Sequence, residues 1–78
     1  MIKRTVTKHQ AERVLALCGN PAITLEMPWS WTGHPALLTE GVCDAIALAA
    51  TLQDRIDAAC IPVWCEPYSS YAISLYRR

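Results

Sequence analysis

A short amphipathic helix with clear signals at both ends constrains this sequence most. Thr7 and Gln10 have the spacing of a capping box, in which a hydroxyl and an amide side chain satisfy backbone groups at a helix start. Gly19 stands where helices often end in a left-handed residue, and Pro21 prevents continuation. The apolar residues in between recur with helical spacing and form one stripe: Ala11, Val14, Leu15 and Cys18. A single stripe predicts that this helix packs on one side against the rest of a small domain.

The length and composition support a folded chain. With 78 residues, the sequence is expected to form a single domain over residues 1–78. Such a chain buries only about 60% of the surface that its unfolded form exposes, so its stability margin is narrow. Its residues are 53% apolar and only 18% charged, which is the opposite of the composition typical of disorder.

Alternation of apolar and polar residues predicts short strands on both sides of this helix. Residues 2–6 suit an edge strand, because Lys3 and Arg4 discourage pairing with another chain. Residues 22–27 alternate in the same way, with their apolar side chains on one face. Residues 36–38 fit either a short strand or the approach to the next helix.

A second helix is predicted from Thr39 or Glu40 to about Ala58. Its early acidic residues suit the positive end of the helix dipole. Its predicted apolar stripe contains Val42, Ala45, Ile46, Ala49, Leu52, Ile56 and Ala59, widened by Leu48.

The last part of the sequence predicts a β-hairpin. Residues 60–66 and 71–78 alternate, and residues 67–70 have the composition of a turn, so we expect a four-residue loop. Pro62 favours an edge position or a bulge for the first of these strands. The predicted class is α+β, with two helices packed on one face of a small, mostly antiparallel sheet and the order β-α-β-α-β-β.

The N-terminal residues lack the apolar run of a secretory signal peptide, and no stretch is long enough to span a membrane. We therefore expect a cytoplasmic protein without a membrane partner. Its four cysteines, Cys18, Cys43, Cys60 and Cys65, are then expected to be reduced thiols. Their wide spacing is not that of metal ligands, and no phosphate-binding glycine loop occurs, so no metal and no cofactor are expected.

The net charge of zero hides an uneven distribution. Residues 1–25 carry a net charge of +3, residues 26–66 carry −5, and residues 67–78 carry +2. If the first and last strands are neighbours, the basic residues of both ends converge. The expected basic patch contains Lys3, Arg4, Lys8, Arg13, Arg77 and Arg78. Such a patch suits phosphates or an acidic protein surface, although solvated chain ends protected from edge pairing explain it equally well.

Large aromatic residues form the second unusual group, because the sequence has three Trp and three Tyr but no Phe. Trp and Tyr are frequent anchors at protein interfaces. The segment from Trp29 to Pro35 contains no Lys or Arg, which favours a protein over a nucleic acid as its partner. The predicted partner-binding residues are Trp29, Trp31, His34, Trp64 and Tyr68. The competing interpretation is that Trp29 and Trp31 close one end of a small core.

These features favour a small protein-binding module that is not an enzyme, with a host or cognate protein complex as its partner. The chain resembles, in size and in its lack of a recognisable site, the small accessory inhibitors of phages and mobile elements, of which anti-CRISPR proteins are the best-known group. That resemblance implies an inhibitor that occupies a surface of its target, and it assigns no individual residue.

Three alternatives remain open. The basic patch suits a nucleic-acid-associated protein, and its affinity would then fall steeply with salt. A reactive cysteine would indicate a small thiol-dependent enzyme or redox protein. An edge strand could also pair two copies into a homodimer.

Overall fold

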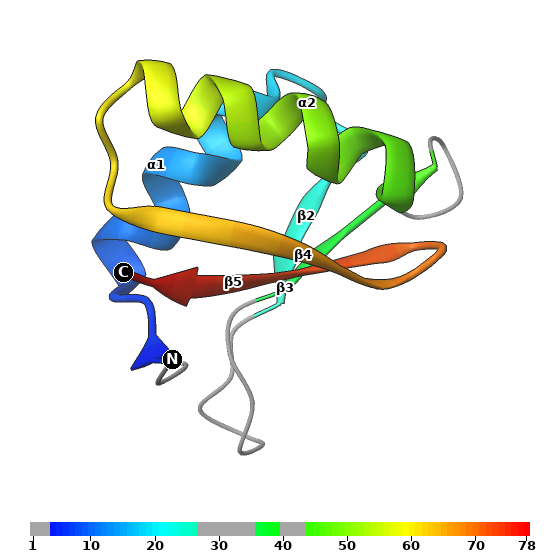
Figure 1. Cartoon of the computed structure of the whole chain (residues 1–78). Coiled ribbons are helices and arrows are strands. Elements are labelled where there is room, and N and C mark those ends of the chain that lie inside the picture. The colour runs from blue at the N-terminus through cyan, green and yellow to red at the C-terminus, as the bar shows by residue number, and fades with distance from the viewer. Residues whose placement is uncertain (1–3, 27–35, 40–43) are drawn as a thin grey trace.

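The computed structural model describes residues 4–26, 36–39 and 44–78. Figure 1 shows a sheet with helices lying across one of its faces. In chain order the described elements are β1 (Arg4–Thr5), α1 (Lys8–Cys18), β2 (Thr24–Glu26), β3 (Ala36–Leu38), α2 (Ala45–Ala58), β4 (Val63–Ser69) and β5 (Ala72–Arg77). This arrangement confirms the predicted α+β class with two helices on one face of an antiparallel sheet, and it adds β3, which the sequence left open.

β5 is the central strand of the sheet. It pairs antiparallel with β4 along one edge, from Val63 opposite Arg77 to Ser69 opposite Ala72. β3 and β1 share the other edge of β5, because a strand has only two edges. β3 pairs with the first half of β5, and β1 pairs with the last two residues of β5. β2 pairs with β3 on its outer side. The first and last strands are therefore neighbours, which is the condition under which the basic residues of both ends converge.

The ends of α1 confirm the local prediction. The Thr7 side chain accepts a hydrogen bond from the Gln10 backbone N–H at 3.1 Å, and the Thr7 N–H donates to the Gln10 side chain at 3.0 Å. Gly19 closes the helix in a left-handed conformation with φ of 63°. Ala11, Val14 and Cys18 are buried on its inner side.

The predicted start of the second helix is wrong by about five residues. α2 begins after Asp44, whose side chain accepts a hydrogen bond from the Ile46 N–H at 2.9 Å. Thr39 instead belongs to the sheet end, because it is buried and its N–H donates to the Tyr71 carbonyl at 3.0 Å. Residues 40–43 lie outside the described part of the chain.

One member of the predicted stripe of α2 is also wrong. Ala45, Ala49, Leu52 and Ile56 are buried, whereas Ile46 is 57% exposed. Ile46 lies in the first turn of the helix, one position after Ala45, whose own side chain faces the core. The i, i+3, i+4 rule allows both positions on a wide stripe, and the sheet beneath covers only one of them.

The C-terminus of α2 ends in a Schellman motif. The Ile61 N–H donates to the Ile56 carbonyl at 3.2 Å and the Cys60 N–H to the Asp57 carbonyl at 3.1 Å. Cys60 takes the left-handed position with φ of 57°, which glycine usually occupies. Ile56 and Ile61 are both buried, which supplies the hydrophobic contact that accompanies this motif.

The predicted hairpin is confirmed, but its boundaries are wrong. β4 begins at Val63 rather than Cys60 and continues through Pro67 to Ser69. Its ladder skips Tyr68, since Pro67 pairs with Ile73 and Ser69 with Ala72. This bulge absorbs the proline and shortens the expected four-residue loop to a tight turn at Ser70 and Tyr71.

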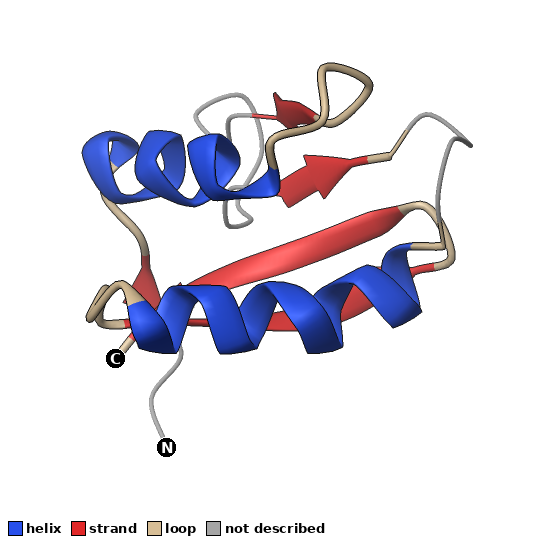
Figure 2. Cartoon of the chain, turned by 90° about the horizontal axis from the view of Figure 1, so that it is seen from above, coloured by secondary structure: helices blue, strands red, loops and turns tan. Residues whose placement is uncertain are grey.

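The core lies between the helices and the facing side of the sheet. Figure 2 shows the two helices and the strands from above. Its largest fully buried apolar side chains come from both helices and from β3, β4 and β5, namely Leu37, Leu52, Ile56, Ile73, Leu75, Val14 and Val63. The alternate residues of β5, Ala72, Ser74 and Tyr76, are also buried, so β5 has little exposure on either face.

Candidate functional site

Three large apolar side chains are strongly exposed in the described part of the chain: Tyr68 at 66%, Tyr71 at 59% and Ile46 at 57%. All three belong to one end of the molecule. The turn between β4 and β5 is tied to the start of α2 by a hydrogen bond of 3.0 Å from the Ala45 N–H to the Ser70 carbonyl. Figure 1 shows the hairpin turn and this end of α2 on the same side. We call Ile46, Tyr68 and Tyr71 the hairpin-end surface.

Local backbone geometry explains why these side chains protrude. Tyr68 occupies the bulge of β4, and Tyr71 lies in the turn itself. Thr39, which follows β3, fixes the turn. The Tyr71 carbonyl accepts hydrogen bonds from the Thr39 N–H at 3.0 Å and from the Thr39 hydroxyl at 3.3 Å. The two exposed tyrosine rings are therefore attached to backbone that hydrogen bonds from Thr39 and Ala45 hold in place.

Of the predicted partner-binding residues, Tyr68 belongs to this surface. Trp64 does not belong to it, because Trp64 is partly buried. The centroid of its ring lies 5.3 Å from that of Tyr76, and its indole N–H donates to the Glu66 carboxylate at 3.2 Å. Trp29, Trp31 and His34 lie outside the described residues, and their role stays a prediction. The sequence analysis missed Tyr71, because it placed that residue at the start of a strand, and Ile46, because it assigned that residue to the core.

The predicted basic patch is brought together in part. Arg4 and Arg77 lie directly opposite each other on β1 and β5. Arg78 follows and forms an ion pair with Asp57 at 3.8 Å, while Lys8 pairs with Glu12 within α1 at 4.0 Å. Arg13 is exposed on α1, and Lys3 lies outside the described residues.

Arg77 is the unusual member of this group. Its residue is partly buried, and its Nε is a buried donor without a hydrogen-bond partner in the described structure. A buried donor that has lost water without gaining an acceptor is unfavourable. Its cross-strand neighbour is another arginine, so the charge of Arg77 gains no compensation from β1.

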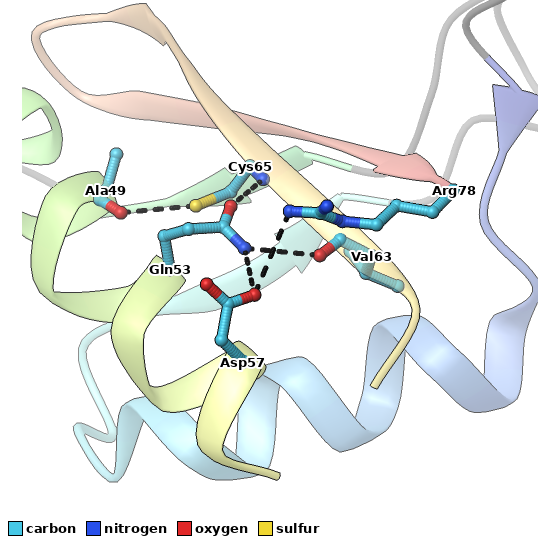
Figure 3. A network of polar contacts seen from close by, with 6 residues as sticks. All are labelled: Ala49, Gln53, Asp57, Val63, Cys65 and Arg78. Carbon is cyan, nitrogen blue, oxygen red and sulfur yellow. Dashed lines mark hydrogen bonds and ion pairs between the residues drawn. The ribbon is translucent and has the colours of Figure 1, made fainter. Parts of the chain in front are cut away.

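A polar network closes the outer edge of β4 (Figure 3). The Gln53 amide of α2 accepts from the Cys65 N–H at 2.8 Å and donates to the Val63 carbonyl at 3.3 Å. The Val63 N–H donates to the Ile61 carbonyl at 2.8 Å, and Pro67 has no N–H. These groups point away from β5, so the donors that a further strand would use are occupied or absent along this edge. No local pattern in the sequence indicates this role of Gln53.

Two of the described cysteines, Cys18 and Cys65, are poorly placed for thiol chemistry. Burial raises the pKa of the Cys65 thiol to about 11, and its sulfur donates to the Ala49 carbonyl at 3.2 Å, so it stays protonated at neutral pH. Cys18 is buried on α1, Cys60 is exposed, and Cys43 lies outside the described residues. Among the residues that the structure describes, no group of three His, Cys, Asp or Glu side chains is placed to hold a metal ion.

Comparison of the chain with protein-family models, curated proteins and solved structures finds no match. Neither described helix is long and apolar enough to cross a membrane.

Proposed function

We propose that this protein is a small non-catalytic binding module that captures a protein partner through its hairpin-end surface. The observation that carries this proposal is the exposure of Ile46, Tyr68 and Tyr71 at a single end of the molecule. Isolated exposed apolar side chains are ordinary, but a group of them that includes two tyrosines is typical of an interface centre. The partner would be a host or cognate protein complex, and the module would act by covering one of its surfaces, as small inhibitors of the anti-CRISPR kind do.

The way in which the two tyrosines are held supports this role. Both rings are presented by backbone that the sheet and Thr39 fix in place, so binding would cost little loss of backbone freedom. Tyrosine also loses few side-chain rotamers when it is immobilised. The segment from Trp29 to Pro35 stays part of the proposed contact region, on the sequence alone.

Affinity capture from the extract of the source cell tests the proposal. Two copies of the bait are compared, the natural chain and a Tyr68→Ser, Tyr71→Ser double variant, each with a far-UV circular dichroism spectrum to confirm folding. Asp54→Ser provides the control, since Asp54 is exposed on α2 and lies toward the end of that helix opposite Ile46. A specific partner is expected with the natural chain and the control and is lost with the double variant. Equal capture by all three would refute the proposed surface.

A nucleic-acid-associated function is the second candidate, and the register of Arg4 opposite Arg77 favours it. It predicts retention on DNA or RNA that weakens steeply as salt rises, because phosphate binding releases counterions. Absence of retention at low salt would eliminate it. In either case we place the protein in the cytoplasm, where the exposed Cys60 would stay reduced. A Cys60-linked dimer isolated from the source cell would contradict that location.

A further inference from the structure

Two arginines face each other across the pairing of β1 and β5. Arg4 and Arg77 are direct partners in an antiparallel ladder, so their side chains leave the sheet on the same face. Directly opposed residues have Cβ atoms about 4.5–5.5 Å apart, and like charges at that separation destabilise a sheet. The pair therefore repels itself unless an anion lies between the two guanidinium groups.

Nothing in the described structure provides that anion. Neither guanidinium has a hydrogen bond or ion pair to another described residue, and the Nε of Arg77 is buried without an acceptor. An exposed arginine can usually turn all of its donors toward water. The Nε of Arg77 does not do so, because it is buried. An external oxyanion would compensate the opposed charges through the guanidinium nitrogens that water reaches, since the buried Nε is closed to a partner as well.

The neighbouring charges show how large that anion can be. Arg78 is already paired with Asp57, and Lys8 is paired with Glu12. Binding along a nucleic-acid backbone requires several basic groups that each neutralise a phosphate. Of the described residues of the basic patch, Arg4, Arg13 and Arg77 have no ion pair, but only Arg4 and Arg77 are direct neighbours on paired strands. Two neighbouring guanidinium groups match one planar group with two oxygens, since the guanidinium fork binds carboxylates through two parallel hydrogen bonds.

We propose that Arg4 and Arg77 form a binding site for one carboxylate side chain of a protein partner. This inference rests on the proposed function and gives it a second contact point, at the end of the sheet where β1 pairs with β5. The partner would then present an acidic residue to the arginine pair and an apolar patch to the hairpin-end surface.

The test is a titration of the natural chain with a tetraglutamate peptide, followed by the NMR resonances of the arginine Nε–Hε groups. Sodium chloride at matched ionic strength provides the reference, because general screening also weakens the repulsion between the arginines. We expect a saturable shift of the Arg77 Nε–Hε resonance that sodium chloride does not reproduce. Arg77→Gln should weaken binding of the peptide at least about tenfold, since it removes a charged donor. Arg55→Gln is the matched control, because Arg55 is exposed on α2 and does not belong to the basic patch, and it should leave the affinity unchanged.

Three outcomes would overturn the inference: no saturable shift, a shift that sodium chloride reproduces, or unchanged affinity in Arg77→Gln. Tighter binding of an oligothymidylate than of the peptide would also overturn it in favour of the nucleic-acid function. If Arg77→Gln does not fold, Arg4→Gln on the exposed strand β1 takes its place, with the same expected loss. The peptide lacks apolar side chains and so does not probe the hairpin-end surface. Its failure to bind would therefore refute the arginine site while leaving the capture experiment to decide the proposed function.

Discussion

Replacing Gln53 should weaken the fold and open the edge of β4. The Gln53 amide holds the Cys65 N–H at 2.8 Å and the Val63 carbonyl at 3.3 Å, and it also donates to the Asp57 carboxylate at 3.0 Å (Figure 3). Gln53→Leu keeps the size of the side chain and a similar helix propensity but removes every one of these contacts.

The expected loss of stability follows from the two backbone groups left without a partner. A buried polar group that loses its partner costs about 1–3 kcal/mol. The Cys65 N–H and the Val63 carbonyl lie at a sheet edge that water reaches in part, so the lower end of this range applies to each, which gives about 2 kcal/mol in total. The exposed contact with Asp57 contributes little. For a domain of this size the loss corresponds to a fall in Tm of about 10 °C.

Urea unfolding followed by far-UV circular dichroism measures this loss, and sedimentation velocity reports the second effect. With Gln53 removed, the outward backbone groups of Val63 and Cys65 become available to another strand, so we expect concentration-dependent association. Ala50→Leu is the matched control, because it also places a leucine on an exposed position of α2. If Gln53→Leu stays within about 0.5 kcal/mol of the natural chain, the scatter typical of surface substitutions, and remains monomeric, then Gln53 does not close this edge.

Three further changes test local features of the fold. Cys60→Gly should stabilise the chain by about 0.5–1 kcal/mol because a left-handed residue favours glycine, whereas Cys60→Val should destabilise it, and equal Tm values would contradict the strain. Thr7→Ala should cost about 1 kcal/mol in urea unfolding through loss of the capping box, while Thr7→Ser should retain most of the stability; equal losses would exclude a role for the hydroxyl. Burial raises the pKa of the Cys65 thiol to about 11, so the folded chain keeps this proton at a pH where the unfolded chain releases it. The contribution of the Cys65 proton to the free energy of unfolding should be complete below about pH 9 and should fall as the pH rises toward 11. In Cys65→Ala the free energy of unfolding should fall less steeply over this range, and parallel pH profiles of the two proteins would contradict the raised pKa.

Elements with local signals could be predicted from the sequence. The helix α1 was predicted at both ends because its capping box and its left-handed glycine are short-range features that tertiary packing does not override. The hairpin was also predicted, whereas the pairing of the first and last strands entered only as a condition for the basic patch. In contrast, three residues carry no readable period, so β3 stayed undecided although it lies in the middle of the sheet.

The errors arose where several local signals competed. The start of α2 had an acidic residue at Glu40 and another at Asp44, and only the second caps the helix. In the hairpin, Pro67 resembled the start of a turn, but a bulge allows it to remain in an edge strand. That shift of boundary hid Tyr71 from the candidate site. Gln53 had no signal at all, because its partners are two backbone groups that are ten and twelve residues away.

The closed edge of β4 bears on how this protein could recognise a partner. Small sheet proteins often bind by adding a partner strand to an open edge, which uses backbone hydrogen bonds and reads little of the sequence. Here Gln53, Ile61 and the missing N–H of Pro67 leave that mode without outward donors on β4 from Val63 to Pro67. A homodimer through this strand is disfavoured for the same reason. Recognition would then depend on side chains. The candidates are Tyr68 and Tyr71 at the turn of the hairpin, and Arg4 and Arg77 at the opposite end of β5. If strand addition were nevertheless the mode of binding, Gln53→Leu should strengthen partner capture, whereas recognition through side chains requires that capture follow the tyrosine and arginine variants alone.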